Sequence, residues 1–224
     1  MDCNLPSGES FVRQFLYGQQ YFESRFGEKC KVFWLPDTFG YSAQLPQIIK
    51  QAGAEYFLTQ KLSWNLINKF PHSTFFWKGL DGTQVLTHFP PSDTYNAHVT
   101  VKQTQMCVTN HKDVDRSNRS MMLFGHGDGG GGPTWDMVHR ALKFKDVDGL
   151  PKIEMRPPNA FFQEVRDQDA QKLVTWDGEL YFELHRGTYT SQANNKLQNR
   201  KNEFALQSLE ALWSLGVIHG HPVE

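Results

Sequence analysis

The sequence predicts an α/β fold built around a mainly parallel sheet or barrel. Short apolar segments, rich in aromatic and β-branched residues, alternate along the chain with longer segments whose apolar residues recur at helical spacing. Strands that alternate with helices are typical of parallel sheets, because each parallel connection needs a long crossover. Hydrophobic residues make up 39% of the 224 residues, which supports a real core and excludes a disordered chain.

Helices are expected where apolar residues return every three or four positions. In the first of them phenylalanine recurs between polar residues, and Ser7 or Ser10 is a suitable N-cap. Gly53 would end the second, and prolines stand near the start of the third and fourth. The expected helices cover residues 11–26, 44–52, 134–144, 159–166 and 191–215.

Strands are expected at short apolar runs bounded by turn-forming residues. The turn at residues 79–82 predicts a hairpin between two of them, and another ends at a glycine-rich loop. The expected strands cover residues 31–35, 56–59, 74–77, 85–89, 121–124 and 179–185. The texture of the sequence changes after Leu173, so we expect one domain over residues 1–172 and the start of another over 173–224.

Composition narrows the class of partner. The net charge is −1, which gives no reason to expect nucleic acid or an anionic membrane. No apolar run approaches the ~18 residues that span a bilayer. The first ten residues lack the basic and apolar regions of a signal peptide. The three cysteines are widely spaced and form no metal-binding or disulfide pattern, which favours a reducing compartment.

Asp37 is the first candidate for an active-site residue. It directly follows the apolar run at residues 32–35, and α/β enzymes keep catalytic groups where a strand ends and a loop begins. On local spacing alone, an Asp that caps a turn or a helix is the competing interpretation.

Three longer strings add specificity to this interpretation. They are WLPDTFGYSAQLPQI at 34–48, FGHGDGGGGPT at 124–134 and GELYFELHRGTYTS at 178–191. In this order they resemble the class II α-mannosidases of glycoside hydrolase family 38, most closely the cytosolic neutral branch. The resemblance extends from about Met1 to about Leu215. It implies part of a seven-stranded β/α barrel, followed by the start of a helical middle domain.

The resemblance also implies roles for single residues. Asp37 matches the nucleophile of a retaining mechanism, which in this family also binds one divalent metal ion, zinc or cobalt. Asp128 is the candidate acid/base, with substrate binding or turn formation as alternatives. The glycines around Asp128 leave the backbone free to approach a ligand. His126 in the same loop does not match a metal ligand.

Substrate contacts are expected from residues near these two acids. Lys61 falls where related enzymes place a basic residue, and core packing is the alternative for the aromatic residues. The candidates are Trp34, Phe39, Lys61, Trp64 and His88. The third string, with Glu183, helps to identify the family but suggests no catalytic role.

The sequence departs from the family in its metal ligands. The family's His-x-Asp pair upstream of the nucleophile and a later His have no counterpart here. One carboxylate cannot hold a four-coordinate zinc ion, so the other ligands are expected outside this chain, which would be an internal segment of a longer enzyme. The expected partner is a mannose-containing oligosaccharide, and the full-length protein is compatible with homo-oligomer formation.

Two other functions remain to be compared with this one. An inactive or mannose-binding segment would keep the aromatic pocket without the complete metal site. A phosphate-binding loop is disfavoured, because no Lys-Ser or Lys-Thr follows the glycine run. The resemblance favours a cytoplasmic location, with the vacuole or lysosome as alternatives.

Overall fold

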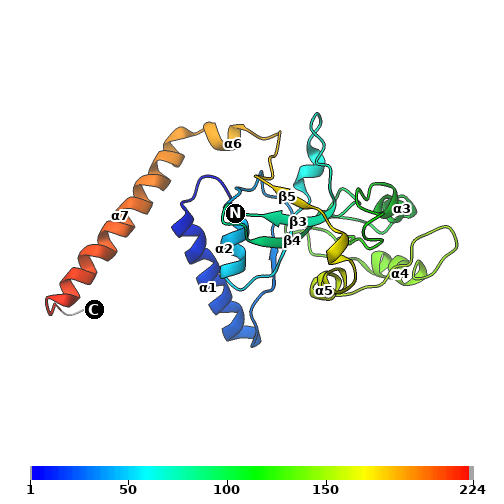
Figure 1. Ribbon diagram of the computed structural model, residues 1–224, viewed down its shortest axis with the longest axis horizontal. Coiled ribbons are helices and arrows are strands. Elements are labelled where there is room, and N and C mark those ends of the chain that lie inside the picture. The colour runs from blue at the N-terminus through cyan, green and yellow to red at the C-terminus, as the bar shows by residue number, and fades with distance from the viewer. Residues whose placement is uncertain (1, 222–224) are drawn as a thin grey trace.

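The computed structural model describes residues 2–221 and confirms the α/β class. Five strands form one sheet in the order β1-β2-β4-β3-β5 (Figure 1). They are β1 (Val32–Trp34), β2 (Tyr56–Leu58), β3 (Thr74–Lys78), β4 (Gln84–His88) and β5 (Thr175–Asp177). Only β3 and β4 pair in antiparallel fashion within the described sheet, so the mainly parallel sheet and the predicted hairpin are both confirmed.

Apart from the last two, the described helices lie beside the sheet or at one end of it (Figure 1). The α-helices are α1 (Gly8–Phe26), α2 (Leu45–Gln51), α3 (Val101–Thr109), α4 (Trp135–Lys143), α5 (Pro158–Asp169), α6 (Gly187–Thr190) and α7 (Ala193–Ile218). Two short 3₁₀-helices, η1 (Lys61–Trp64) and η2 (Ala170–Lys172), follow β2 and α5. Ser7 caps α1 by accepting from Ser10 N at 3.2 Å, and Gly27 ends it in the left-handed conformation.

The central strand β2 is apolar on both faces, and both of its faces are covered. Phe57 of β2 packs in a cluster with side chains of α1 and α2, including Phe15 and Ile49. Its neighbours Tyr56 and Leu58 point the other way, into a cluster with α5. A strand buried on both faces loses the alternation of polar and apolar residues, which explains the continuous apolar runs in the sequence.

Two predicted strands are wrong. Residues 121–124 form a single isolated bridge, between Phe124 and Ala97, and residues 179–185 form one between Leu180 and Tyr41. Both segments are extended and partly apolar, but neither has a neighbouring strand among residues 2–221 with which to continue a hydrogen-bonded ladder. Helix α3 and strand β5 were not expected.

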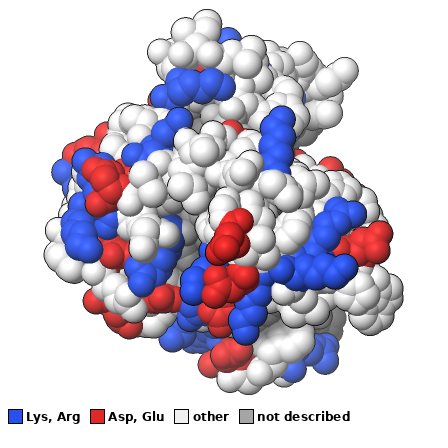
Figure 2. Space-filling view, turned by 90° about the vertical axis from the view of Figure 1, so that its right-hand side faces the viewer, with Lys and Arg blue, Asp and Glu red and all other residues white. Residues whose placement is uncertain are grey.

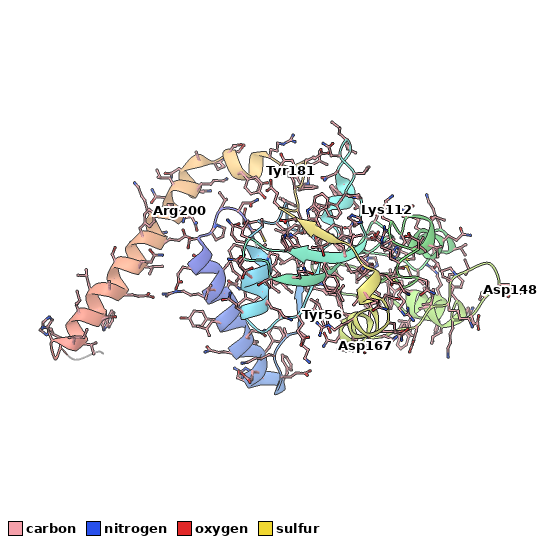
Figure 3. All side chains as sticks on the ribbon, in the orientation of Figure 1. Tyr56, Lys112, Asp148, Asp167, Tyr181 and Arg200 are labelled. Atoms are coloured by element: carbon pink, nitrogen blue, oxygen red, sulfur yellow. The ribbon has the colours of Figure 1, made fainter. Side chains whose placement is uncertain are left out.

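The sheet continues beyond the expected domain boundary, since β5 lies after residue 172 and pairs with β3. The division at that residue stays a prediction. Beyond β5, helix α7 leads away from the sheet (Figure 1). Arg200 on this helix, labelled in Figure 3, donates to Leu5 O at 2.9 Å, and Arg13 of α1 forms an ion pair with Glu210. None of the helices in the described part of the chain combines the length and the apolar character that crossing a bilayer requires.

Candidate active site

The register of two parallel strands brings Asp37 and Lys61 together. Trp34 of β1 is paired with Leu58 of β2, and each of the two charged residues lies three positions beyond its strand's member of that pair. Beyond the strands, Gln60 N donates to Pro36 O at 3.3 Å, which keeps the two loops side by side. Lys61 Nζ therefore lies 2.7 Å from Asp37 Oδ1.

Lys61 is buried in an aromatic environment. Its side chain is only 5% exposed, and its ammonium group lies 3.4 Å from the centre of the Trp64 ring and 5.2 Å from that of Phe39. A cation over aromatic faces is attracted to them, and it is held more firmly where water is excluded. Phe39 and Trp64 thus fix the ammonium group toward Asp37.

The two oxygens of Asp37 have different surroundings. Oδ1 is buried and makes no hydrogen bond of good geometry with any described residue. Its charge is compensated by the ion pair with the Lys61 ammonium group. Oδ2 lies 3.2 Å from the hydroxyl oxygen of Tyr95. The side chain as a whole is 41% exposed, which leaves this carboxylate accessible to a ligand.

Tyr95 connects the two candidate catalytic acids. Its hydroxyl oxygen lies 3.1 Å from Asp128 Oδ1 and 3.2 Å from Asp37 Oδ2, so these two carboxylate oxygens are at most 6.3 Å apart. Burial and the hydrogen bond to Asp128 raise the pKa of Tyr95 above its usual range. The phenol therefore keeps its proton at neutral pH and can donate it to a carboxylate.

Asp128 sits at the tip of the glycine-rich loop. The loop closes through paired backbone hydrogen bonds between His126 and Gly132, at 2.8 and 2.9 Å. Asp128 itself has a φ of 52°, a left-handed conformation that costs energy for a residue with a side chain. Such a conformation is typical of functional sites, where the surroundings enforce it.

A cavity of about 730 Å³ opens beside the two acids. Trp34, Asp37, Tyr95 and Asp128 line one part of it, and residues 118–124 and 151–156 line much of the rest. Its size is in the range of small-molecule binding sites. Figure 2 shows that basic and acidic side chains are interspersed over the face of the molecule at the α3 and α4 end, so that face carries no patch of a single sign.

The structure gathers most of the predicted site residues around Asp37, some of them in the wall of the cavity and others around the Lys61 ammonium group. Trp34 and Trp64 are partly exposed, whereas Phe39 packs against Phe182 and His185. The residues brought together are Asp37, Asp128, Trp34, Phe39, Lys61 and Trp64. His126, near the start of the glycine-rich loop, is exposed, and the centre of its ring lies 5.4 Å from that of His98.

His88 does not reach the site. Its side chain is fully buried, with Nδ1 2.9 Å from Thr74 Oγ1 and Nε2 accepting from Met121 N at 3.0 Å. Burial lowers its pKa well below the usual 6.5, so the ring is neutral. Its position at the last residue of β4 resembles that of a site residue, but its side chain points into the core between β3 and residue 121.

Tyr95 and the neighbouring Asn96 were not expected at the site. Both lie in the loop after β4. Strand β2 pairs in parallel with both β1 and β4, so the carboxyl ends of these three strands lie at the same edge of the sheet. That topology is the signal that could have found them, because every loop at this edge can reach Asp37.

The third string, residues 178–191, contacts the segments that carry Asp37 and Lys61. Leu180 exchanges two backbone hydrogen bonds with Tyr41, at 2.9 and 3.0 Å, which pins the loop that carries Asp37. Glu183 N donates to Asn65 Oδ1 at 2.9 Å, and the Glu183 carboxylate accepts from the backbone of Asn68. These contacts give the string a structural role next to the loop of Lys61.

The described residues do not by themselves fit a metal site. Among residues 2–221 no group of three His, Cys, Asp or Glu side chains lies close enough to hold an ion. Asp37 supplies one oxygen that lacks a hydrogen bond, but Lys61 already occupies its neighbourhood with a positive charge. No catalytic step is therefore assigned to a metal here.

Known proteins resemble this chain over most of its length. It is 61% identical over 214 residues to alpha-mannosidase G of Dictyostelium discoideum, covering 96% of this chain and 20% of that protein. It is 54% identical over 217 residues to alpha-mannosidase 2C1 of Homo sapiens, covering 97% and 21%. The chain thus spans about one fifth of the length of these curated relatives.

Solved structures agree with this relationship at the level of the fold. An alpha-mannosidase from Enterococcus faecalis V583 superposes with a TM-score of 0.62 at 19% sequence identity, covering 80% of this chain and 21% of that chain. Residues 1–179 also match the sequence pattern of the glycosyl hydrolases family 38 N-terminal domain. Because that pattern covers most of the sequence, the chain belongs to glycosyl hydrolase family 38.

Proposed function

We propose that this chain carries the nucleophile and the acid/base of a retaining α-mannosidase that removes terminal α-linked mannose from oligosaccharides. The observation that supports this most is the single phenol hydroxyl shared by Asp37 and Asp128. Retaining glycosidases hold their two carboxyl groups about 5–5.5 Å apart, and inverting ones about 6.5–9.5 Å. The bridged oxygens are at most 6.3 Å apart, which is below the inverting range and so supports the proposal of a retaining mechanism.

Asp37 is the proposed nucleophile. The Lys61 ammonium forms an ion pair with Oδ1, while the Tyr95 hydroxyl donates a hydrogen bond to Oδ2. Asp37 attacks the anomeric carbon, and the glycosidic bond breaks as Asp128 protonates the leaving oxygen. Water then attacks the covalent intermediate, with Asp128 accepting its proton and Asp37 leaving as a carboxylate.

Tyr95 suits this division of roles because it has a single proton. When that proton is donated to ionised Asp37, the phenol oxygen is free to accept a hydrogen bond from protonated Asp128. A retaining enzyme needs one ionised and one protonated acid before the first step, and a single shared phenol can make hydrogen bonds to such a pair. Trp34 and Trp64 are the proposed aromatic surfaces for the sugar.

Metal dependence follows from family membership and remains a proposal for this chain. A divalent ion, zinc or cobalt, would supply Lewis-acid chemistry at the substrate's hydroxyl groups when bound. The described cysteines Cys3, Cys30 and Cys107 are free thiols, which agrees with the proposed cytoplasmic location.

The test is hydrolysis of p-nitrophenyl α-mannoside by the naturally expressed protein that contains this chain, with and without added zinc or cobalt. Asp37→Asn should abolish turnover while leaving the circular dichroism spectrum unchanged. NMR of the first-formed sugar should show the α-anomer, and a 2-deoxy-2-fluoro mannoside should label Asp37. A first-formed β-anomer would refute the retaining mechanism. Binding of mannose without turnover would favour the mannose-binding alternative.

A further inference from the structure

One hydrogen bond ties the loop after β4 to the glycine-rich loop. The side-chain oxygen of Asn96 accepts from Gly127 N at 2.7 Å. Asn96 directly follows Tyr95, and Asp128 directly follows Gly127. The bond therefore joins the immediate neighbours of two residues whose side chains also meet, at 3.1 Å.

The backbone on the Asn96 side of this bond is well anchored. Ala97 N donates to Leu123 O, and Gly125 N donates to Ala97 O, each at 3.0 Å. Asn96 N donates to Thr94 Oγ1, also at 3.0 Å. The two segments thus run side by side up to Gly125, and Asn96 extends that attachment two residues further, to Gly127.

The loop beyond Gly125 is closed by its own backbone hydrogen bonds, between His126 and Gly132 and from Gly130 N to Gly127 O, but its glycines make little contact with the rest of the protein. Gly129, Gly131 and Gly132 adopt left-handed conformations and contact nothing in the space where a side chain would be. Glycine has more backbone freedom than any other residue, and Asp128 sits among these glycines in a conformation that costs energy. The internal hydrogen bonds set the shape of the loop, whereas its position relative to Tyr95 depends on attachments to the segment that carries Tyr95 and Asn96.

The backbone at Gly127 also packs closely against the side chains of Tyr95 and Asn96. A Cβ atom at this position would lie 2.3 Å from Asn96 Oδ1 and 3.0 Å from the ring of Tyr95. The loop backbone is therefore seated directly on the Tyr95–Asn96 pair, and hydrogen bond and contact fix the same point of the chain.

We propose that Asn96 is a positioning residue, which holds the Gly127 amide so that the carboxyl group of Asp128 stays beside the Tyr95 hydroxyl. Asn96 acts through Gly127 and has no role of its own in bond breaking. Its effect on catalysis rests on the proposed function, whereas its effect on the loop does not.

The first test measures the loop directly. Amide hydrogen exchange of residues 125–132 should be about tenfold faster in Asn96→Ala than in the natural sequence. Asn96→Asp keeps an acceptor at the same place and should restore protection. Asn195→Ala, on the exposed side of α7, is the matched control and should change nothing in the loop. Unchanged exchange in Asn96→Ala would overturn the proposal.

The second test compares leaving groups in the naturally expressed enzyme. An acid is needed most for a poor leaving group, so Asn96→Ala should lower kcat about 10- to 100-fold for a mannose disaccharide and much less for 2,4-dinitrophenyl α-mannoside. In an Asp128→Ala background it should cost nothing further. Equal losses for both substrates, or losses that add to those of Asp128→Ala, would refute the positioning role. If the natural enzyme hydrolyses neither substrate, the proposed function fails, and the exchange result alone decides the role of Asn96.

Discussion

The ammonium group of Lys61 lies 3.4 Å from the centre of the Trp64 ring, closer than to any other aromatic ring around it. Trp64 ends the 3₁₀-helix η1 that Lys61 begins, so one turn of backbone sets both sides of this contact. The indole covers a cation that is almost fully withdrawn from water. The consequence is a fixed positive charge opposite Asp37, with little freedom to turn away.

Replacement of this charge should affect activity more than stability. Lys61→Met keeps much of the apolar stem but leaves Asp37 Oδ1 without a counter-charge. We expect kcat/KM for p-nitrophenyl α-mannoside to fall about 100-fold. Because Asp37 is partly exposed, the free energy of unfolding in urea should fall by only about 1–2 kcal/mol. Lys61→Arg keeps the charge and is the control. Wild-type turnover in Lys61→Met would contradict the role given to this residue.

Loss of the bridging hydroxyl should slow catalysis without unfolding the loop. Tyr95→Phe keeps the ring that packs against Gly127 and removes the group shared by Asp37 and Asp128. Hydrogen bonds to charged groups contribute about 1.5–3 kcal/mol, so kcat should fall about 10- to 100-fold. Steady-state kinetics and thermal unfolding measure the two effects separately. A large drop in Tm with unchanged kcat would show that the hydroxyl serves the fold instead.

An added methyl group in the glycine-rich loop should displace the acid/base candidate. Gly127→Ala would bring a Cβ atom against Asn96 Oδ1 and the Tyr95 ring, so the Asn96 side chain would have to turn away from Gly127 N and the ring would have to shift. We expect at least a tenfold loss in kcat, because small displacements of catalytic groups cost this much or more. Gly18→Ala, in open space on α1, is the matched control and should be neutral or slightly stabilising. Equal activity of the two variants would mean that the loop adjusts freely.

The stability of the fold should fall on mild acidification. Burial, with a smaller contribution from His111, lowers the pKa of His88 well below 6.5 in the folded state, whereas the unfolded chain binds a proton near the usual value. The unfolded state therefore binds more protons as the pH falls from about 7 to about 5.5, and the free energy of unfolding decreases.

Denaturant unfolding across this pH range measures that slope. His88→Gln removes the titrating group, so it should be less stable at neutral pH but show a shallower decline. His111, whose pKa burial also lowers, should retain part of the slope. The same slope in His88→Gln and in the natural sequence would remove His88 from this account.

Most of the fold could be predicted because local signals agreed with the tertiary structure. The strand that contains Phe57 and the helix capped by Ser7 follow directly from apolar runs and capping residues. The segment at 121–124 has the same local signal, but strand formation needs a partner that the local sequence does not specify. Helix α3, which was not expected, does have a local signal in the sequence, because Thr100 and Gln103 form a capping box at its start.

Residues of the candidate site could be predicted from the sequence only where the family resemblance pointed to them. Asp37, Lys61 and Asp128 lie in or near the strings that carry the resemblance, and the structure brings them together. Tyr95 has no local feature that separates it from a core tyrosine, because its importance comes from the strand order. His88 shows the opposite case, since its place at a strand end says nothing of which way its side chain points.

The pairing of Trp34 with Leu58 has a consequence for how this sequence could evolve. Asp37 and Lys61 each lie three residues beyond their strand's member of that pair. Their ion pair therefore depends on the register of the two strands and not on either loop alone. A slip of two residues would keep every side chain on its proper face yet separate the charges by about 6–7 Å. Substitutions inside the strands are thus tolerable wherever they preserve packing, whereas a single insertion before either loop would disconnect the acid from its cation.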